Sequence, residues 1–223
     1  VFTDDTTYTV PELVSEVVVS TACAQVSNLT WKTGITEGFE GDNGIAYFNA
    51  NGSGFPIEEG VVLSTGRAFR SRGPNTSELS DGAAAWSGDT DLFNYIQGLG
   101  IDPDLEDYNN ATVLEFDFVP LTGHISFPFV FASEEYGQFQ CNFSDAFAFF
   151  LTNTETGQTT NLALLPNSNT PISVVTIRDG ANADCAPANP EYYAQNNQGS
   201  NAMAAALRRR RDWARFWRAL SIV

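Results

Sequence analysis

Short segments in which apolar and polar residues alternate predict a chain built mainly from β-strands. Residues 113–119 alternate two acidic side chains with Leu and Phe, and residues 124–133 carry a large apolar side chain at every second position from Ile125 onward. Residues 146–152 are almost entirely apolar, as is typical of a central strand. Further strands are expected at residues 24–31, 45–48, 60–64, 161–165 and 172–178. Because turn-forming residues separate these segments, we expect an all-β fold, a two-layer antiparallel β-sandwich or jelly roll.

The first of two expected helices lies near the N-terminus. Residues 8–20 combine an extended lead-in with a short amphipathic stretch, and Pro11 suits a first helical turn. We therefore predict a short helix here, although the run Val17–Val19 also suits a strand.

The second helix is predicted inside the longest irregular stretch, residues 67–110. Residues 89–99 have the length and spacing of one short helix, with Asp89 or Thr90 as its N-cap. A stretch this long without a strand pattern is usually functional or disordered, so it is a candidate location for the functional site.

The last residues differ from the rest in composition. Residues 204–223 hold six of the 11 basic residues, and their spacing predicts a basic amphipathic helix. Its apolar face would carry Trp213, Phe216, Trp217 and Leu220, and its basic face Arg211, Arg215 and Arg218. Such a helix could lie on an anionic membrane or dock on an acidic surface. We therefore divide the chain into a β-domain at residues 1–203 and a tail at residues 204–223.

Charge is distributed unevenly between these two parts. The chain has a formal net charge of −16, but residues 1–203 hold 26 of the 27 acidic and 5 of the 11 basic side chains, a net charge of −21. This charge repels nucleic acid and anionic membranes, so we expect no nucleic-acid partner, and membrane contact only through the tail. The acids are either a solvated surface or ligands of divalent cations, and composition does not separate these alternatives.

The three cysteines favour one disulfide and an extracellular location. Cys141 and Cys185 both lie in loop-like surroundings rich in Asn and Pro, so we expect these two to pair. Cys23 follows an apolar run and would be buried, or would pair outside this sequence. No CxxC motif is present and His124 is the only histidine, which excludes the usual zinc sites. We expect a secreted or cell-surface protein.

Several segments together carry a resemblance to a known family. The two most specific are Val130-Phe-Ala-Ser-Glu-Glu-Tyr136 and Asn142-Phe-Ser-Asp-Ala-Phe-Ala-Phe149. Others are Cys23-Ala-Gln-Val-Ser-Asn28, Gly60-Val-Val-Leu-Ser-Thr-Gly66, Gly88-Asp-Thr-Asp-Leu92, Leu114-Glu-Phe-Asp-Phe-Val-Pro120, Asn161-Leu-Ala-Leu-Leu-Pro166, Thr170-Pro-Ile-Ser173, and Cys185 followed by Tyr192-Tyr193. In this order and with this spacing, the segments resemble the choice-of-anchor L domain family of bacterial surface and secreted proteins. The resemblance implies a β-rich module for adhesion or surface display without a defined reaction.

The resemblance ends where the basic tail begins. Family members continue after the Tyr-Tyr region with further strands, whereas this chain continues with Ala, Arg and Trp. A frameshift, a chimeric gene end or an appended tail would each produce such a change. In that case the closing strands of the sandwich are missing, and we expect an exposed sheet edge.

Acidic residues in the loops are the candidate metal site. Calcium takes six to eight oxygen ligands, which loops supply readily, so calcium is the expected cofactor. The candidate ligands are Asp81, Asp89, Asp91, Glu134, Glu135 and Asp145. The alternative is that these acids only cap turns, with Asp89 capping a helix.

Aromatic residues in or near the loops are the candidate ligand-binding residues, because such rings stack on sugars or anchor peptides. They are Trp86, Tyr95, Tyr136 and Phe139, with the alternative that they form local core under the long loops. Adjacent Glu134 and Glu135 do not give the carboxylate pair of a glycosidase, and no GxSxG motif accompanies His124. We therefore expect a non-enzymatic module that binds a surface glycan or protein. A carbohydrate-binding or carbohydrate-active module is the alternative.

Overall fold

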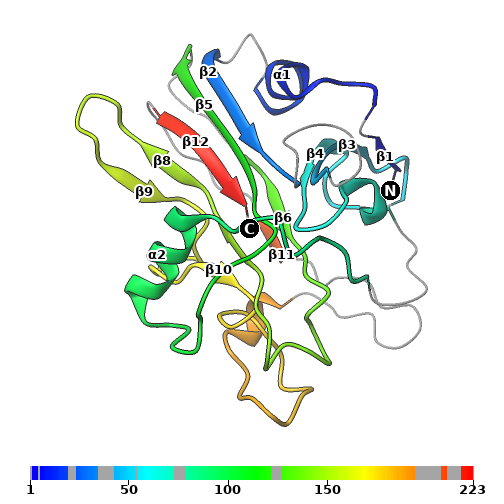
Figure 1. The fold of residues 1–223 in the computed structure, drawn as a ribbon, viewed down its shortest axis with the longest axis vertical. Coiled ribbons are helices and arrows are strands. Elements are labelled where there is room, and N and C mark those ends of the chain that lie inside the picture. The colour runs from blue at the N-terminus through cyan, green and yellow to red at the C-terminus, as the bar shows by residue number, and fades with distance from the viewer. Residues whose placement is uncertain are drawn as a thin grey trace.

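The computed structural model describes residues 2–4, 6–19, 24–34, 43–53, 55–72, 79–121, 127–193, 207–209 and 217–222. Strands dominate these residues, and each strand pair is antiparallel (Figure 1). The strands are β1 (Phe2–Asp4), β2 (Ala24–Lys32), β3 (Ile45–Asn49), β4 (Glu59–Leu63), β5 (Thr112–Pro120), β6 (Phe129–Phe131), β7 (Ala146–Ala148), β8 (Phe150–Thr152), β9 (Thr159–Asn161), β10 (Ile172–Ser173), β11 (Leu207–Arg209) and β12 (Trp217–Ile222). The helical segments are α1 (Val10–Glu12) with a π-helical turn at Leu13–Val18, α2 (Thr90–Leu99), and 3-10 turns at Ala68–Ser71 and Pro190–Tyr192. The predicted all-β antiparallel class is confirmed.

Two larger sheets and two strand pairs make up the described strands. The five-stranded sheet has the order β10-β7-β12-β5-β2, and the three-stranded sheet has the order β1-β3-β4. The pairs are β6 with β11 and β8 with β9. In Figure 1, β2, β5 and β12 run side by side, while β1, β3 and β4 lie together on the right.

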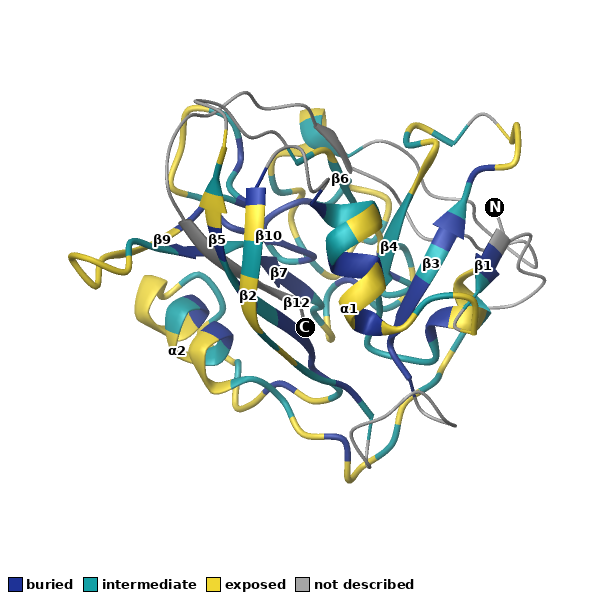
Figure 2. Cartoon of the chain, turned by 90° about the horizontal axis from the view of Figure 1, so that it is seen from above, coloured by how far each residue is buried: buried dark blue, intermediate teal, exposed yellow. Residues whose placement is uncertain are grey.

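The main hydrophobic core lies between the two larger sheets, as expected for a sandwich. Leu114, Phe116 and Phe118 alternate along β5 and pack in this core with Leu13 of the π-helical turn and Ile45 of β3. Figure 2 shows α1 and the three-stranded sheet on one side of the five-stranded sheet and α2 on the other. The period of two that the sequence shows along β5 is therefore a real division between two faces.

Two acidic side chains in the middle of the other row of β5 are held by β2. Asn28 Nδ2 donates to Asp117 Oδ2 at 2.6 Å, and Thr30 Oγ1 donates to Glu115 Oε2 at 3.3 Å. The register of β2 against β5 shifts between Ser27 and Thr30, and Asn28 has a φ of 50° there. This bulge twists the edge strand of the sheet, which is a common protection against unwanted pairing.

Both predicted helices are present. Asp89 Oδ1 accepts from the Leu92 backbone N–H at 2.8 Å and so caps α2, whose Leu92 and Ile96 are buried against Val113 of β5. Gly100, with a φ of 64°, ends the helix in the left-handed conformation that glycine adopts readily.

At the N-terminal helix the helical alternative is correct and the strand at Val17–Val19 is not. Thr9 and Glu12 form a capping box, in which Thr9 Oγ1 accepts from the Glu12 N–H and the Glu12 carboxylate accepts from the Thr9 N–H. This reciprocal cap starts the helix at Val10, and the π-helical turn continues it through Val18.

Three predicted strands are shorter than the sequence pattern indicates. Residues 146–152 split at Phe149, whose backbone N–H donates to the side chain of Asn161 at 2.9 Å, so that β7 and β8 enter different sheets. Residues 172–178 leave the strand after Ser173, because Thr176 Oγ1 donates to the Pro171 carbonyl at 2.7 Å and closes a turn. The expected strand at 161–165 shares only its first residue with the observed strand, because β9 spans Thr159–Asn161.

The predicted C-terminal helix is wrong for the described part of the tail. Residues Leu207–Arg209 form β11 on β6, and Trp217–Ile222 form β12 between β5 and β7. The helical spacing is a local preference, whereas a strand in this position satisfies backbone groups of two neighbouring strands at once. Sheet pairing therefore overrides the amphipathic pattern. Arg211, Trp213, Arg215 and Phe216 lie outside the described residues.

Candidate functional site

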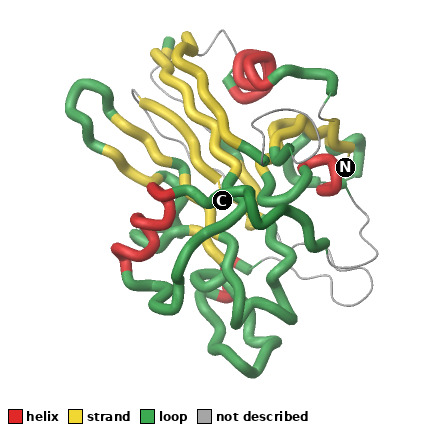
Figure 3. Tube along the Cα trace, viewed as in Figure 1, coloured by secondary structure: helices red, strands yellow, loops and turns green. Residues whose placement is uncertain are grey.

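One end of the molecule consists almost entirely of loops (Figure 3). It is formed by residues 134–143, between β6 and β7, and residues 178–193, after β10. We call these two segments the loop end. Loops held on a β-scaffold are the usual place for binding residues, so we describe this end in detail.

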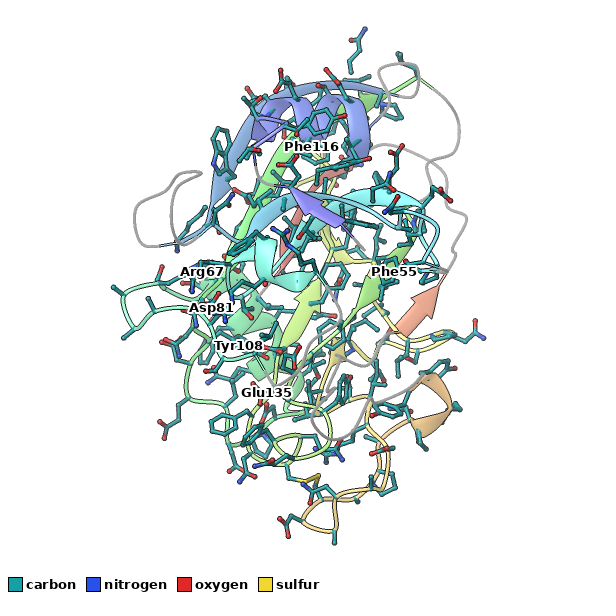
Figure 4. All side chains as sticks on the ribbon, turned by 90° about the vertical axis from the view of Figure 1, so that its right-hand side faces the viewer. Phe55, Arg67, Asp81, Tyr108, Phe116 and Glu135 are labelled. Atoms are coloured by element: carbon teal, nitrogen blue, oxygen red, sulfur yellow. A yellow bond between two sulfur atoms is a disulfide. The ribbon has the colours of Figure 1, made fainter. Side chains whose placement is uncertain are left out.

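A disulfide joins the two segments of the loop end. Cys141 and Cys185 are bonded, with their Cα atoms 5.5 Å apart and a sequence separation of 44. The pairing predicted from the loop-like surroundings of these cysteines is thus confirmed. Figure 4 shows the bond at the bottom of the molecule, far from the β-sheets.

Hydrogen bonds across the same two segments add to the disulfide. Arg178 Nη1 donates to the Gln140 carbonyl at 3.2 Å, and Arg178 Nε donates to the Ala186 carbonyl at 2.8 Å. Asn182 Nδ2 donates to the carbonyls of Gly137 and Gln138 at 3.1 and 3.2 Å. The sequence did not predict these bracing roles. Asn182, for example, donates to backbone carbonyls more than 40 residues earlier in the chain.

Phe143 is the most exposed aromatic anchor of the loop end. Its side chain is 60% exposed, and its ring lies 6.1 Å from that of Phe139, centroid to centroid, at 70°. The Phe143 and Asn142 backbone N–H groups both donate to the Phe139 carbonyl, which holds the tip in a turn. Phe139 was among the sequence candidates and Phe143 was not, although its place two residues after Cys141 points to the same surface.

The other three aromatic candidates lie elsewhere or are covered. Trp86 is fully buried and its indole N–H donates to the Ala111 carbonyl at 2.8 Å, so its ring belongs to the core. Tyr136 is also buried and packs edge-on against Tyr193 at 5.1 Å. Tyr95 of α2 is half-buried against Phe150. These positions correct the expectation that Trp86 and Tyr136 present their rings to a ligand.

Asp81, the first metal candidate, is held by arginines. Arg67 donates to Asp81 through Nε at 3.0 Å, Nη2 at 3.1 Å and its backbone N–H at 2.9 Å, and Arg70 Nη1 lies 3.5 Å from the same carboxylate. Figure 4 shows Arg67 beside Asp81 and Glu135 further towards the loop end. Burial alone would raise the pKa of Asp81, but the hydrogen bonds and charge of Arg67 outweigh it and lower the pKa.

The other aspartates among the metal candidates lie in different local structures. Asp89 caps α2 and Asp91 is exposed in its first turn. Asp145 accepts from Ser133 Oγ at 2.6 Å, and that hydroxyl also accepts from the Glu135 backbone N–H at 3.1 Å. Within the described residues, no three His, Cys, Asp or Glu side chains gather in a group that could hold a metal ion.

The Ser133–Asp145 hydrogen bond ties the start of the loop end to β7. Burial raises the pKa of the Asp145 carboxyl, against the opposing effect of the Ser133 hydroxyl. Burial, together with the nearby charge of Asp145, also raises the pKa of Tyr136. The pKa of Tyr193 is raised to about 12, by burial and then by the charge of Asp179, so the Tyr136–Tyr193 pair stays neutral at physiological pH.

Comparison with known proteins identifies the family of this chain. The family model described as the choice-of-anchor L domain matches residues 2–208. The chain belongs to the choice-of-anchor L domain family. No curated protein and no solved structure matches it. Membership indicates a bacterial surface-associated module, and the disulfide of this choice-of-anchor L domain is consistent with an extracellular location.

Other sequence-based expectations for this choice-of-anchor L domain fall outside the described residues. His124 and Cys23 both lie in such segments. Among the helices that the structure describes, none is long and apolar enough to cross a membrane.

Proposed function

We propose that this domain is a non-catalytic extracellular binding module for adhesion or surface display, and that the loop end is its binding face. The observation that carries the proposal is Phe143, a large apolar side chain that is 60% exposed on a loop joined to its neighbour by a disulfide. An exposed aromatic ring on an already ordered loop binds with a smaller loss of conformational entropy than one on a free segment.

The chemistry of the loop end favours binding over catalysis. Two of its polar side chains, Arg178 and Asn182, already donate to backbone carbonyls. The buried Asp145 is engaged by Ser133, and its raised pKa disfavours the charged form. What the loop end offers a partner is apolar area at Phe143 and Phe139 within a polar rim, the arrangement of a binding anchor.

The second candidate is carbohydrate binding, which the same rings favour, because an exposed aromatic face stacks on the apolar face of a sugar. A glycan array and an array of surface-coated proteins, probed with the labelled domain, separate the two ligand classes. We expect Phe143→Ser to lose most binding in whichever array gives a signal. Phe69→Ser is the matched control, because Phe69 is 39% exposed but lies on the 3-10 turn at Ala68–Ser71.

Three results decide the proposal. Binding to either array that depends on Phe143 but not on Phe69 supports it, and the array that responds names the ligand class. Equal loss in both variants would show that the loop end is not the binding face. Turnover of a polysaccharide by the domain would replace the proposal with the carbohydrate-active alternative.

Calcium bracing of the loops remains a separate proposal, based on the acidic charge of residues 1–203. It predicts a clearly higher melting temperature in calcium than in EDTA. An identical melt in both would overturn it without affecting the proposed binding face.

A further inference from the structure

β12 fills the middle of the five-stranded sheet and joins two strands that do not pair with each other. On β5, Trp217 stands opposite Phe118 and Ile222 opposite Thr112. On β7, Ser221 stands opposite Ala148, and Ile222 pairs with both β5 and β7. We call the space between β5 and β7 the strand slot. Without β12 it would be a gap of roughly 10 Å, two strand spacings wide, lined by backbone groups that need partners.

The segment that fills the slot lies outside the residues that the family model matches. The family match ends at residue 208, whereas β12 begins at Trp217. The tail that supplies β12 also differs from the domain in composition, with six arginines in residues 204–223. The slot holds β12 through backbone pairing, a mode of recognition that depends little on the occupant's sequence.

Charge favours a basic occupant. Residues 1–203 carry a net charge of −21, and the tail holds one acidic residue against its six arginines. In the register of β12 on β5, Arg218 stands opposite Asp117. The opposite net charges of the tail and the domain favour their association.

We propose that the strand slot is a strand-binding site that accepts Trp217–Ile222 of a second copy of this chain as well as the chain's own segment, and so links copies into pairs. The backbone partners of β12 are the same whichever molecule supplies it. Exchange of an identical element between two copies is a low-cost route to dimers, because the contacts in the slot are kept. Display of many copies on one surface would raise the local concentration that exchange needs.

Mixed single-cysteine variants of the full chain test whether exchange occurs. In a Cys23→Ser background, one variant carries Ala148→Cys and the other Ser221→Cys, two positions that face each other in the slot. Facing positions on antiparallel strands meet the Cα spacing of a disulfide. After mixing and oxidation, we expect a covalent heterodimer on non-reducing gels. In the control mixture Arg209→Cys replaces Ser221→Cys, because Arg209 faces Phe129 of β6 and not β7.

The outcomes are distinct. A heterodimer from the first mixture and none from the control supports the proposal. Equal amounts from both mixtures would mean random surface contact, and no heterodimer at the highest soluble concentration would overturn exchange. The double variant with both cysteines in one chain tests the slot itself. A disulfide within one chain shows that β12 occupies the slot. No disulfide in the double variant and none in the mixture would overturn the strand slot.

A second measurement uses proline, which has no backbone N–H to donate to a neighbouring strand. Ser221→Pro should lower the melting temperature of the full chain relative to Ser221→Ala, which keeps the N–H. A synthetic peptide of residues 215–223, added in excess, should restore part of the loss in the proline variant. Equal melting of the two variants contradicts the pairing of Ser221. If the proline variant does not fold, the cysteine mixtures still decide the question.

Discussion

Replacing Asp81 by asparagine isolates the ion pair that holds the start of the long irregular region. The change keeps the shape of the side chain and removes its charge. It weakens three hydrogen bonds from Arg67, at 3.0, 3.1 and 2.9 Å, and the contact with Arg70 at 3.5 Å. The site is intermediate between core and surface, because the Asp81 side chain is 15% exposed and both arginines are 39% exposed.

The expected cost follows from that intermediate position. A hydrogen bond to a charged group contributes about 1.5–3 kcal/mol, whereas a fully exposed ion pair contributes about 0.2–1 kcal/mol. Solvent screens the arginines, so we expect Asp81→Asn to lower the free energy of unfolding by about 2 kcal/mol. In a domain of this size that is a fall of about 4–8 °C in melting temperature.

The pH dependence of stability is an independent test of this ion pair. Because the pKa of Asp81 is lower in the folded domain, the unfolded chain binds its proton first as the solution is acidified. The stabilisation is therefore complete at neutral pH and is lost as pH falls below about 4, the usual pKa of aspartate, and through the folded pKa. The difference between wild type and Asp81→Asn should shrink over the same range.

Urea denaturation at pH 7 and at acidic pH, in calcium and in EDTA, measures the loss of unfolding free energy and its dependence on pH. We expect the same loss in both metal conditions, because Arg67 and Arg70 already contact both carboxylate oxygens. Asp104→Asn is the control, since Asp104 is exposed in a turn. A loss under 0.5 kcal/mol (about the uncertainty of such measurements), or one seen only in calcium, would refute the ion-pair assignment of Asp81.

Four further variants test other parts of the structure. The double variant Cys141→Ser, Cys185→Ser should lower stability by about 2–4 kcal/mol, because the bond closes a long loop with a sequence separation of 44. Unchanged melting would mean that hydrogen bonds alone hold the loop end. Gly88→Ala should lower the free energy of unfolding, measured in urea, by about 3 kcal/mol, because its new Cβ would lie 1.9 Å from the Tyr108 carbonyl oxygen. Gly98→Ala is the control: its new Cβ has nothing within 4 Å, so the substitution should raise the free energy of unfolding by about 0.5–1 kcal/mol. Trp86→Phe should cost about 2 kcal/mol by thermal melting, because the buried carbonyl that accepts from the indole loses its donor; a neutral effect would contradict that bond.

Features that depend on local sequence were predictable from the chain alone. The alternation along β5 indicates which side chains enter the core, and the Asp89 cap marks the start of α2, because both follow from neighbours a few residues away. The cysteine pair was also predictable, since only Cys141 and Cys185 share loop-like surroundings.

Features that depend on distant partners were not predictable. The break at Phe149 needs the side chain of Asn161, and the turn after Ser173 needs the hydroxyl of Thr176, so apolar runs that look like continuous strands are divided. Asp81 looks like a metal ligand in isolation, because its arginine partner is 14 residues earlier in sequence. Whether a side chain is buried also depends on packing across the whole fold, which neighbouring residues in the sequence do not reveal.

The binding face and the strand slot meet at β7. This strand directly follows the loop end, and its Phe147 packs with Tyr136 while pairing with Ile172 of β10 and with Ile222 of β12. β7 is only three residues long, so its own contribution to sheet pairing is small, and a neighbour on each edge roughly doubles the number of backbone groups that are satisfied. Occupation of the slot therefore orders the strand from which the loop end emerges. A strand supplied in trans would then not only link two copies but also hold Phe143 in the position from which we expect it to bind.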